Sequence, residues 1–326
     1  MNMPQKRGSQ RPIQAKLIFN TLSGQLQDSP QQLADIIMAM QEHGITPEVY
    51  MIRQDSQVES VVRGAIKAGI KLIVVAGGDG TIEGVVGAVI DSTATLGIIP
   101  TGTRNNIAFN LGIPTEITAA VALLRDGLRL KIDVGEVRRG RTRHWFMEAA
   151  SLGLLSDLFP FADNLQHGDL SQIGNLLSTF VASAPSRLRL TLDGHQVPDT
   201  HALIALIANM SYVGAHFQLS PRVSCLDGRL DIFLFSDMSK LDLLMSYASQ
   251  AGEGTPEDPN ITHYRASKVV VSSKPPMPIL ADSFPVGQGK ATLLVHPRAL
   301  AVMTGSAMVG KRMGPRSSKS KVVRRA

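Results

Sequence analysis

The residues best suited to bind a ligand lie in two glycine-containing loops, Gly77 to Thr81 and Pro100 to Thr103. The first loop follows the apolar run Leu72 to Ala76, the second follows Thr95 to Ile99, and a helical pattern comes after each loop. This order of strand, loop and helix places both loops at the carboxyl ends of strands, where open α/β sheets bind their ligands. Glycines allow positive φ angles and leave the N–H groups of a helix start accessible to phosphate. The two loops therefore predict one phosphate-binding crevice.

Two familiar phosphate-binding motifs do not fit the first loop. A dinucleotide fingerprint needs its third glycine where Glu83 stands, one position before Gly84. A Walker A loop needs Gly-Lys-Ser or Gly-Lys-Thr, and the sequence contains neither. The structural alternative is that both loops carry glycine and threonine only to turn the chain. It is disfavoured because two such loops occur in succession and the first contains Asp79.

Both loops resemble motifs of the diacylglycerol kinase catalytic-domain family, which includes bacterial soluble lipid kinases and sphingosine kinases. The first loop matches the family signature Gly-Gly-Asp-Gly-Thr, and Pro100 to Asn106 fills six of the seven positions of its Pro-x-Gly-Thr-x-Asn-Asp segment. The segment Asn20 to Gly24 is similar to the family's Asn-Pro-x-Ser-Gly and lacks only the proline. The resemblance implies that ATP is bound by Asn20, Ser23, Gly24, Gly77, Gly78, Asp79, Gly80, Thr81, Thr101, Gly102, Thr103 and Asn105.

The same resemblance implies a catalytic base and a Mg²⁺ ligand in the second half of the chain. The family's Asp-Gly-Glu motif corresponds to the segment that begins at Asp282, so Asp282 is the candidate general base for the accepting hydroxyl. The family's Asp-Gly-x-Leu motif corresponds to the segment that begins at Asp227, which implies that Asp227 binds Mg²⁺ with the carbonyl oxygens of Ser224 and Arg229. Simpler alternatives stay open, because aspartate often caps a turn at a strand end and Asp-Gly is a common hairpin turn.

Three positions depart from the family pattern. Asn106 stands where the family has aspartate, Phe284 where it has glutamate, and Glu83-Gly84 where it usually has Asn-Glu. Since Mg²⁺ prefers anionic oxygen ligands, these departures predict weaker metal binding or a site reorganised around Glu83. The favoured function is an ATP-dependent lipid kinase that phosphorylates diacylglycerol or another long-chain lipid alcohol. Two alternatives stay open: a nucleotide-binding or regulatory module with little catalysis and, less favoured, a NAD kinase.

The composition describes a globular protein. Of its 326 residues, 44% are hydrophobic and 18% are charged, which suits a sizeable core rather than a disordered chain. The single cysteine, Cys225, excludes an internal disulfide and suits a reducing compartment. No apolar run approaches the ~20 residues that span a bilayer, and no signal-peptide pattern is present. We therefore expect a cytoplasmic protein.

The net charge of +6 is concentrated near the two ends of the sequence. Ten Lys and Arg residues lie in residues 1–12 and 310–326, and the rest of the chain has a net charge of about −4. Tails of this kind are most often simply solvated and disordered, and the functional alternative is attraction to anionic lipid, worth roughly 1 kcal/mol per basic residue. The functional alternative predicts peripheral association with the inner membrane surface, where a lipid substrate would be met. A nucleic-acid partner is disfavoured because aromatic residues make up only 5% of the chain and no nucleic-acid-binding motif is visible. The sequence leaves open whether the protein forms a homodimer.

The order of the expected strands and helices predicts an N-terminal parallel α/β nucleotide-binding domain followed by an antiparallel β-sandwich domain. Strands alternate with helices over residues 13–128, which is typical of a parallel sheet covered on both faces. Residues 129–309 contain short strands in direct succession, which favours a β-rich lipid-binding domain whose last strand could return to the first domain. Helices are expected around residues 170–182 and 239–249.

Two helix starts are predicted from capping boxes. Ser29 with Gln32 precedes the first apolar helical stripe, and Ser56 with Glu59 precedes the second. In each pair we expect the serine hydroxyl to accept a hydrogen bond from the first turn of the helix.

Overall fold

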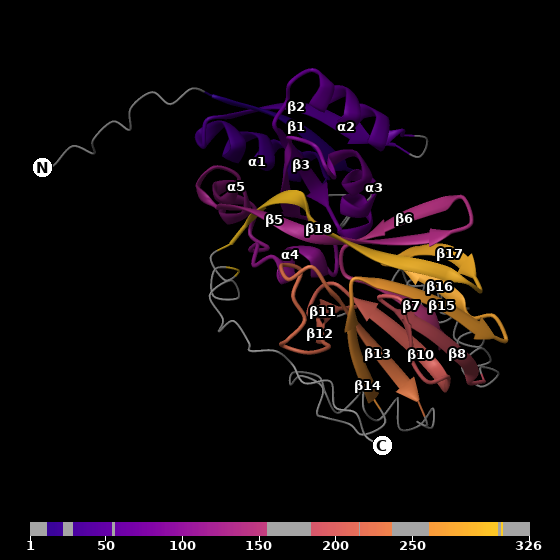
Figure 1. Cartoon of the computed structure of the whole chain (residues 1–326). Coiled ribbons are helices and arrows are strands. Elements are labelled where there is room, and N and C mark those ends of the chain that lie inside the picture. Colours follow the sequence, from indigo (N-terminus) through magenta and orange to yellow (C-terminus); the bar gives the residue numbers. More distant parts are fainter. Residues whose placement is uncertain are drawn as a thin grey trace, which may run out of the picture.

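A computed structural model describes residues 12–21, 29–53, 56–154, 184–214, 216–236, 261–305 and Met308. Figure 1 shows an α/β half at the top and a β-rich half at the lower right. The helices predicted around residues 170–182 and 239–249 lie outside the described residues, as do Ser23, Gly24 and nearly all of both predicted tails.

In the α/β half, four parallel strands lie in the order β2-β1-β3-β4 and helices pack against the sheet. Every residue of β3 and β4 is buried, because helices cover both faces of these strands. The elements of this half are β1 (Ile13–Asn20), α1 (Ser29–Glu42), β2 (Ile45–Ile52), α2 (Val58–Lys67), β3 (Leu72–Gly77), α3 (Asp79–Val89), β4 (Thr95–Pro100), α4 (Asn106–Asn110) and α5 (Ile117–Asp126).

In the β-rich half, antiparallel strands enclose a second hydrophobic core that contains Leu190, Ile207, Val269 and Leu293. The predicted fold class is therefore confirmed. The strands are β5 (Leu128–Arg139), β6 (Thr142–Phe146), β7 (Ala149–Gly153), β8 (Ser186–Leu192), β9 (His195–Gln196), β10 (Thr200–Ala208), β11 (Tyr212–Val213), β12 (Phe217–Gln218), β13 (Leu230–Ser236), β14 (Ile261–Ala266), β15 (Lys268–Lys274), β16 (Pro278–Ala281), β17 (Phe284–Gln288) and β18 (Ala291–Thr304).

Strand β18 joins the two halves into one sheet. Its first part pairs antiparallel with β15, and nearly its whole length pairs antiparallel with β5. Near its end, Val302 pairs in parallel with Leu96 of β4 (Figure 1, yellow). The last strand thus lies along the edge of the α/β sheet, and the two halves share a continuous backbone hydrogen-bond network.

The predicted start agrees with the structure for helix α1 but not for helix α2. α1 starts at Ser29, but α2 starts at Val58, and its N-cap residue Gln57 makes no side-chain cap. The predicted capping box at Ser56 is wrong, because the Ser56 hydroxyl accepts a hydrogen bond from the Arg53 N–H (2.6 Å) and closes the preceding turn instead. No helix in the described ranges is long and apolar enough to cross a membrane.

Candidate functional site

The two glycine loops are in direct contact. A Cβ atom on Gly102 would lie 2.4 Å from the Gly78 Cα, and one on Gly78 would lie 3.2 Å from the Gly102 Cα. Thr101 donates its N–H to the Gly77 carbonyl (3.2 Å), which ties one loop to the other. The expectation that positive φ selects these glycines is wrong for Gly78, whose φ is −89°. Glycine is needed there because two backbones pass too closely for any side chain.

Asp79 of the first loop caps the helix that follows the second loop. Its carboxylate accepts the N–H groups of Asn106 (3.0 Å) and Ile107 (3.0 Å), at the start of α4. An anionic acceptor at this place satisfies helix donors that would otherwise lack partners. Burial raises the pKa of the Asp79 carboxyl, and the two N–H groups oppose that shift. Asp79 thus holds the two loops in register, and its predicted contact with ATP stays a prediction.

Asparagine side chains fix the remaining loop geometry. Asn105 adopts a left-handed φ of 50°, and its side chain bonds both the N–H (3.0 Å) and the carbonyl (2.7 Å) of Gly102. Asn20, at the end of β1, donates to the Thr81 hydroxyl (2.8 Å) at the start of α3. The structure therefore brings together the described residues of the predicted nucleotide site.

Gly80 and Thr103 are the exposed members of the two loops. A Cβ on Gly80 would meet nothing closer than the Ser283 hydroxyl, at 3.9 Å. Ser283 belongs to the turn between β16 and β17 in the β-rich half. The start of α3 therefore faces that turn, and a side chain at position 80 would have room without disturbing the packing.

Asp282 lies in the same turn, opposite the glycine loops. Its carboxylate accepts three backbone N–H groups, from Met147 (2.6 Å), Glu148 (2.9 Å) and Ala149 (2.9 Å). Burial and the nearby Glu83 carboxylate raise the pKa of Asp282 well above its usual range, although the three N–H groups oppose this shift. The side chain is thus held rigidly and is a stronger base than an ordinary aspartate.

Two glutamates complete a cluster of four acids. Glu83, on α3, accepts a hydrogen bond from the Ser283 hydroxyl (2.6 Å), and burial, with a contribution from Asp79, raises its pKa to about 7. Glu148 is only 8% exposed, and burial together with Asp282, Asp79 and Glu83 raises its pKa well above the usual range. These side chains come from both halves of the molecule, and their proximity and burial favour the protonated forms of several of them.

Asn106 and Phe284, which stand where the family has acids, make different contacts. Asn106 is buried, and its side-chain oxygen accepts the N–H of His216 (3.2 Å). Phe284 is 50% exposed and stacks on His144, with 4.3 Å between ring centroids. Sequence reasoning missed Glu148, which is the one acid in the otherwise apolar stretch from Trp145 to Leu154. An acid in such a stretch is a usable signal, because glutamate is rarely buried without a specific reason.

The predicted metal ligand Asp227 has different neighbours. One carboxylate oxygen accepts the N–H of Arg229 (3.1 Å), and the other pairs with the guanidinium of Arg265, which also lies 3.1 Å from Asp231. Burial raises the pKa of Asp227, and its charged neighbours are Arg265 and Asp231 rather than the acids of the cluster. A guanidinium thus already supplies positive charge here, and the role of Asp227 in binding Mg²⁺ stays a prediction.

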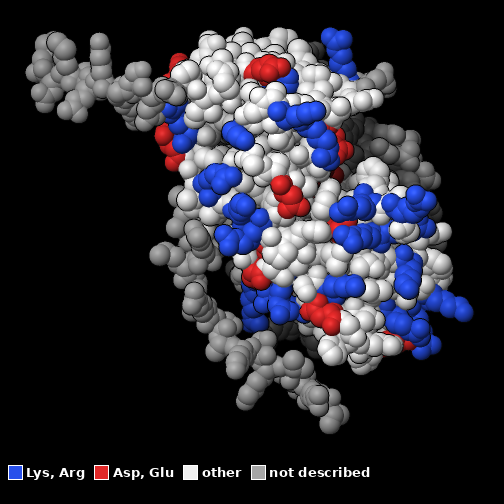
Figure 2. Space-filling model, turned by 45° about the horizontal axis from the view of Figure 1, so that its top comes forward, with Lys and Arg blue, Asp and Glu red and all other residues white. Residues whose placement is uncertain are grey.

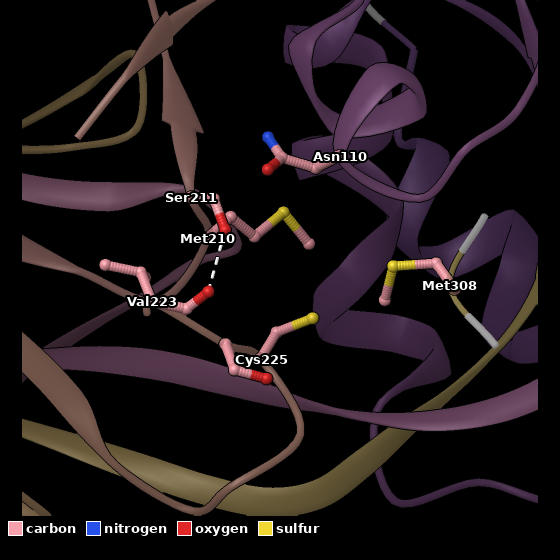
Figure 3. A pocket seen from close by; sticks show the side chains of 7 residues that line it. Asn110, Met210, Ser211, Val223, Cys225 and Met308 are labelled. Atoms are coloured by element: carbon pink, nitrogen blue, oxygen red, sulfur yellow. Dashed lines mark hydrogen bonds between the residues drawn. The ribbon is translucent and has the colours of Figure 1, made fainter. Parts of the chain in front are cut away.

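Ser224 lines a small cavity at the junction of the halves (Figure 3). The sulfur atoms of Met210, Cys225 and Met308 point into this space. The polar groups beside it are already bonded, since the Ser211 hydroxyl donates to the Val223 carbonyl (2.7 Å) and the Asn110 amide donates to the Tyr212 carbonyl (2.8 Å). The role of the Ser224 and Arg229 carbonyl oxygens in binding Mg²⁺ stays a prediction. Across the described part of the chain, no three His, Cys, Asp or Glu side chains are arranged to hold a metal ion by themselves.

Comparison with protein families gives two matches in succession. Residues 14–137 match the diacylglycerol kinase catalytic domain, and residues 162–304 match the YegS C-terminal NAD kinase beta sandwich-like domain. Over residues 14–137 the chain belongs to the diacylglycerol kinase catalytic-domain family. The family resemblance seen in the loop motifs is thereby confirmed, and the family is one of lipid kinases.

Individual relatives agree with this family. The diacylglycerol kinase of Bacillus subtilis (strain 168) is 26% identical over 275 residues, which cover 82% of this chain and 88% of the relative. The "Probable lipid kinase YegS-like" of Stenotrophomonas maltophilia (strain K279a) is 27% identical over 266 residues, covering 78% of this chain and 85% of the relative. Both relatives match over most of their length, so the similarity extends across both halves.

Solved structures show the same fold. The crystal structure of a diacylglycerol kinase from Bacillus anthracis str. Sterne superimposes with a TM-score of 0.70 at 20% identity, covering 92% of this chain and 99% of that one. An NAD kinase from Archaeoglobus fulgidus, solved in complex with ATP, has a TM-score of 0.51 at 11% identity, covering 93% and 98%. At these identities the structures support the fold alone.

Proposed function

We propose that the protein is an ATP-dependent lipid kinase that transfers the γ-phosphoryl group to the hydroxyl of diacylglycerol or a similar long-chain lipid alcohol. One observation carries the proposal: Asp282 of the β-rich half lies in the turn that faces the start of α3, where its neighbour Ser283 bonds Glu83 of the α/β half. The names of the lipid-kinase relatives support the class of acceptor. Neither the position of Asp282 nor the names of the relatives would by itself indicate phosphoryl transfer between a nucleotide and a lipid.

ATP would bind with its phosphates at the start of α3. The helix offers N–H groups and a partial positive charge there, and Gly80 leaves the approach open. The backbone contact between Gly78 and Gly102 holds both loops against this point. The Archaeoglobus fulgidus NAD kinase with bound ATP supports nucleotide binding by this fold.

The donor set of the acid cluster fits Mg²⁺. Carboxylate oxygens are the ligands this ion prefers, and it commonly binds through one or two carboxylates, substrate phosphates and water. That mode needs only one or two acids, and among the residues that the structure describes no three His, Cys, Asp or Glu side chains converge on one point. Glu83 and Glu148 would hold the ion, because Asp79 and Asp282 already accept backbone N–H groups. When bound, Mg²⁺ would neutralise charge on the phosphates.

Asp282 would act as the general base. The three N–H groups fix its carboxylate, and its raised pKa favours uptake of the proton from the lipid hydroxyl as that oxygen forms its bond to the γ-phosphorus. The bond from the γ-phosphorus to the oxygen shared with the β-phosphate breaks in the same transfer, and ADP leaves. The proton would then reside on the Asp282 carboxylate until it is lost to solvent. Asp79 and Asn105 would serve the same reaction indirectly by keeping the loops in place.

A second candidate is a nucleotide-binding module with little catalysis. The observation that favours it is that Asp282 also has a structural task, since its carboxylate organises the backbone from Met147 to Ala149. Its retention therefore does not require a catalytic role. The amide at position 106 and the aromatic ring at position 284 are compatible with this alternative too.

The deciding experiment incubates the full chain with Mg²⁺, labelled ATP and an extracted lipid mixture. We expect label in the lipid fraction and none in NAD, which is included as a competing acceptor. Absence of labelled lipid at every Mg²⁺ concentration, with ATP binding intact by calorimetry, would favour the nucleotide-binding module. Labelled NAD would instead favour a NAD kinase.

A further inference from the structure

Although the chain outside the predicted tails has a net charge of about −4, its charges are not evenly distributed. Figure 2 shows Lys and Arg side chains gathered at the lower right, over the β-rich half. Strand register explains this. Arg187 pairs with Lys274 across β8 and β15, and Arg138 pairs with Arg143 across β5 and β6, so their side chains share one side of the sheet. We call this side the basic sheet face, defined by Arg138, Arg143, Arg187, Arg189, Lys268 and Lys274.

Alternation along the strands directs these cations outward. Leu188, Leu190 and Val269, which alternate with them, are at most 1% exposed and face the core of the sandwich. The four arginine side chains of the face are 46% to 61% exposed. The face is therefore the outer surface of the sandwich, reached by solvent.

The cations of the basic sheet face outnumber its acids. Glu136 is buried and bonds Arg138, Arg143 and His296, while Asp199 pairs with Arg187 and Arg189. Burial disfavours the charged form of Glu136, but the three side-chain hydrogen bonds outweigh it and lower its pKa to about 2. A third acid, Asp193, accepts the Lys268 N–H (2.9 Å) and pairs with Arg229 (3.7 Å). The six cations of the face together with Arg229 stand against these three acids, so the described part of the face keeps an excess of about four positive charges.

One end of the basic sheet face lies beside the candidate site. Trp145 shares the face with its strand partner Glu136, and the guanidinium of Arg143 stands 5.3 Å from its ring centroid. On the other side, a Cβ on Gly87 would lie 3.2 Å from the Trp145 ring. Gly87 follows Glu83 by one turn of α3, so the face begins one helical turn from the acid cluster.

We propose that the basic sheet face docks the protein on an anionic lipid surface. The face is a sheet surface with half-buried Val270 and Leu294 among the cations, which suits contact with many headgroups at once. Trp145, half-buried at one end of the face, is of a residue type enriched at membrane interfaces. Docking of this kind is a binding property that goes beyond the proposed phosphoryl transfer, and it adds a folded surface to the association predicted for the tails.

The test measures binding of the full chain to phosphatidylcholine vesicles with and without phosphatidylserine. The variant Arg189→Gln/Lys268→Gln/Lys274→Gln removes three charges while Arg187 still pairs with Asp199 and Glu136 keeps its partners. At roughly fivefold per cation, affinity for the anionic vesicles should fall about 100-fold. The matched control Arg53→Gln/Lys67→Gln/Lys71→Gln removes three exposed charges from the α/β half and should bind nearly as tightly as the wild type.

Equal losses in the variant and the control, with both proteins folded by circular dichroism, would overturn the proposal, because only net charge would then matter. A variant that keeps its vesicle affinity but loses affinity for duplex DNA would overturn it in favour of a nucleic-acid surface. Vesicle binding is measured without ATP, so it is independent of turnover. Phosphorylation of a short-chain, water-soluble diacylglycerol reports separately on the proposed function, and the variant should retain it.

Discussion

The raised pKa of Glu83 makes the stability of the protein depend on pH in a defined direction. The pKa of this carboxyl rises from 4.5 to about 7 on folding, chiefly through burial. Between these values the folded state keeps a proton that the unfolded state has released, so increasing pH favours unfolding. The corresponding loss is at most about 3 kcal/mol, spread from about pH 4.5 to pH 7, and partial exposure of the side chain reduces it.

Glu83→Gln removes this ionisation while the amide oxygen still accepts the hydrogen bond from Ser283. We therefore expect the variant to gain about 1–3 kcal/mol relative to the wild type at pH 8, and almost nothing at pH 5. Urea unfolding at both pH values measures this difference, with Glu42→Gln on the exposed surface of α1 as the control for loss of one acid.

The same unfolding experiment, repeated with Mg²⁺, tests whether the ion binds the acid cluster that contains Glu83. The ion would bind the ionised cluster, so Mg²⁺ should stabilise the wild type more at pH 8 than at pH 5 and should stabilise Glu83→Gln less. A variant with the same pH dependence and the same Mg²⁺ response as the wild type would refute the assignment of Glu83 to the cluster.

Three further predictions test the remaining parts of the site. Gly80→Val should abolish ATP binding measured by calorimetry without unfolding the protein, whereas Gly64→Val, an exposed helical glycine with nothing within 4 Å, should leave affinity unchanged; similar affinities in both would exclude the start of α3 as the phosphate site. Asp282→Asn should reduce lipid phosphorylation by about 10²–10⁴ with little change in ATP affinity, at a stability cost of about 1–3 kcal/mol from the altered hydrogen bonds, and a smaller loss of rate would leave the residue a structural role only. Asn106→Asp with Phe284→Glu should lower the Mg²⁺ concentration for half-maximal activity, and an unchanged value would show that these positions do not govern metal binding.

The α/β half could be predicted closely because local signals decide it. The runs that became β3 and β4 are continuous and apolar, glycine loops end them, and the helical pattern follows at once. Strand β5 was missed although Leu130, Ile132 and Val134 alternate along it. Charged residues stand between them, and what makes the strand long is its pairing with β18, which the sequence places far away.

The candidate site likewise contains some residues that the sequence identifies and others that only the structure reveals. The loops and Asp282 could be identified from motifs, whereas the reason for the glycine at position 78 depends on how closely a second loop approaches. Glu148 could not be assigned to the cluster, because its burial beside Asp282 arises only when β7 and the turn after β16 come together. The role of Gly78 and the position of Glu148 both depend on distances between segments that are far apart in sequence, and local sequence patterns do not give those distances.

The position of β18 also bears on how the protein is made. This strand occupies the edge of β4, about two hundred residues later in the sequence, and until it arrives that edge is unpaired and open to wrong partners. Contacts of such long sequence separation form late, because the intervening chain must first be ordered. During synthesis the α/β half therefore emerges long before its sheet can close. The glycine loops and Asp282 come together only when nearly the whole chain is available, so we expect the proposed ATP-binding site to form only after the β-rich half is complete.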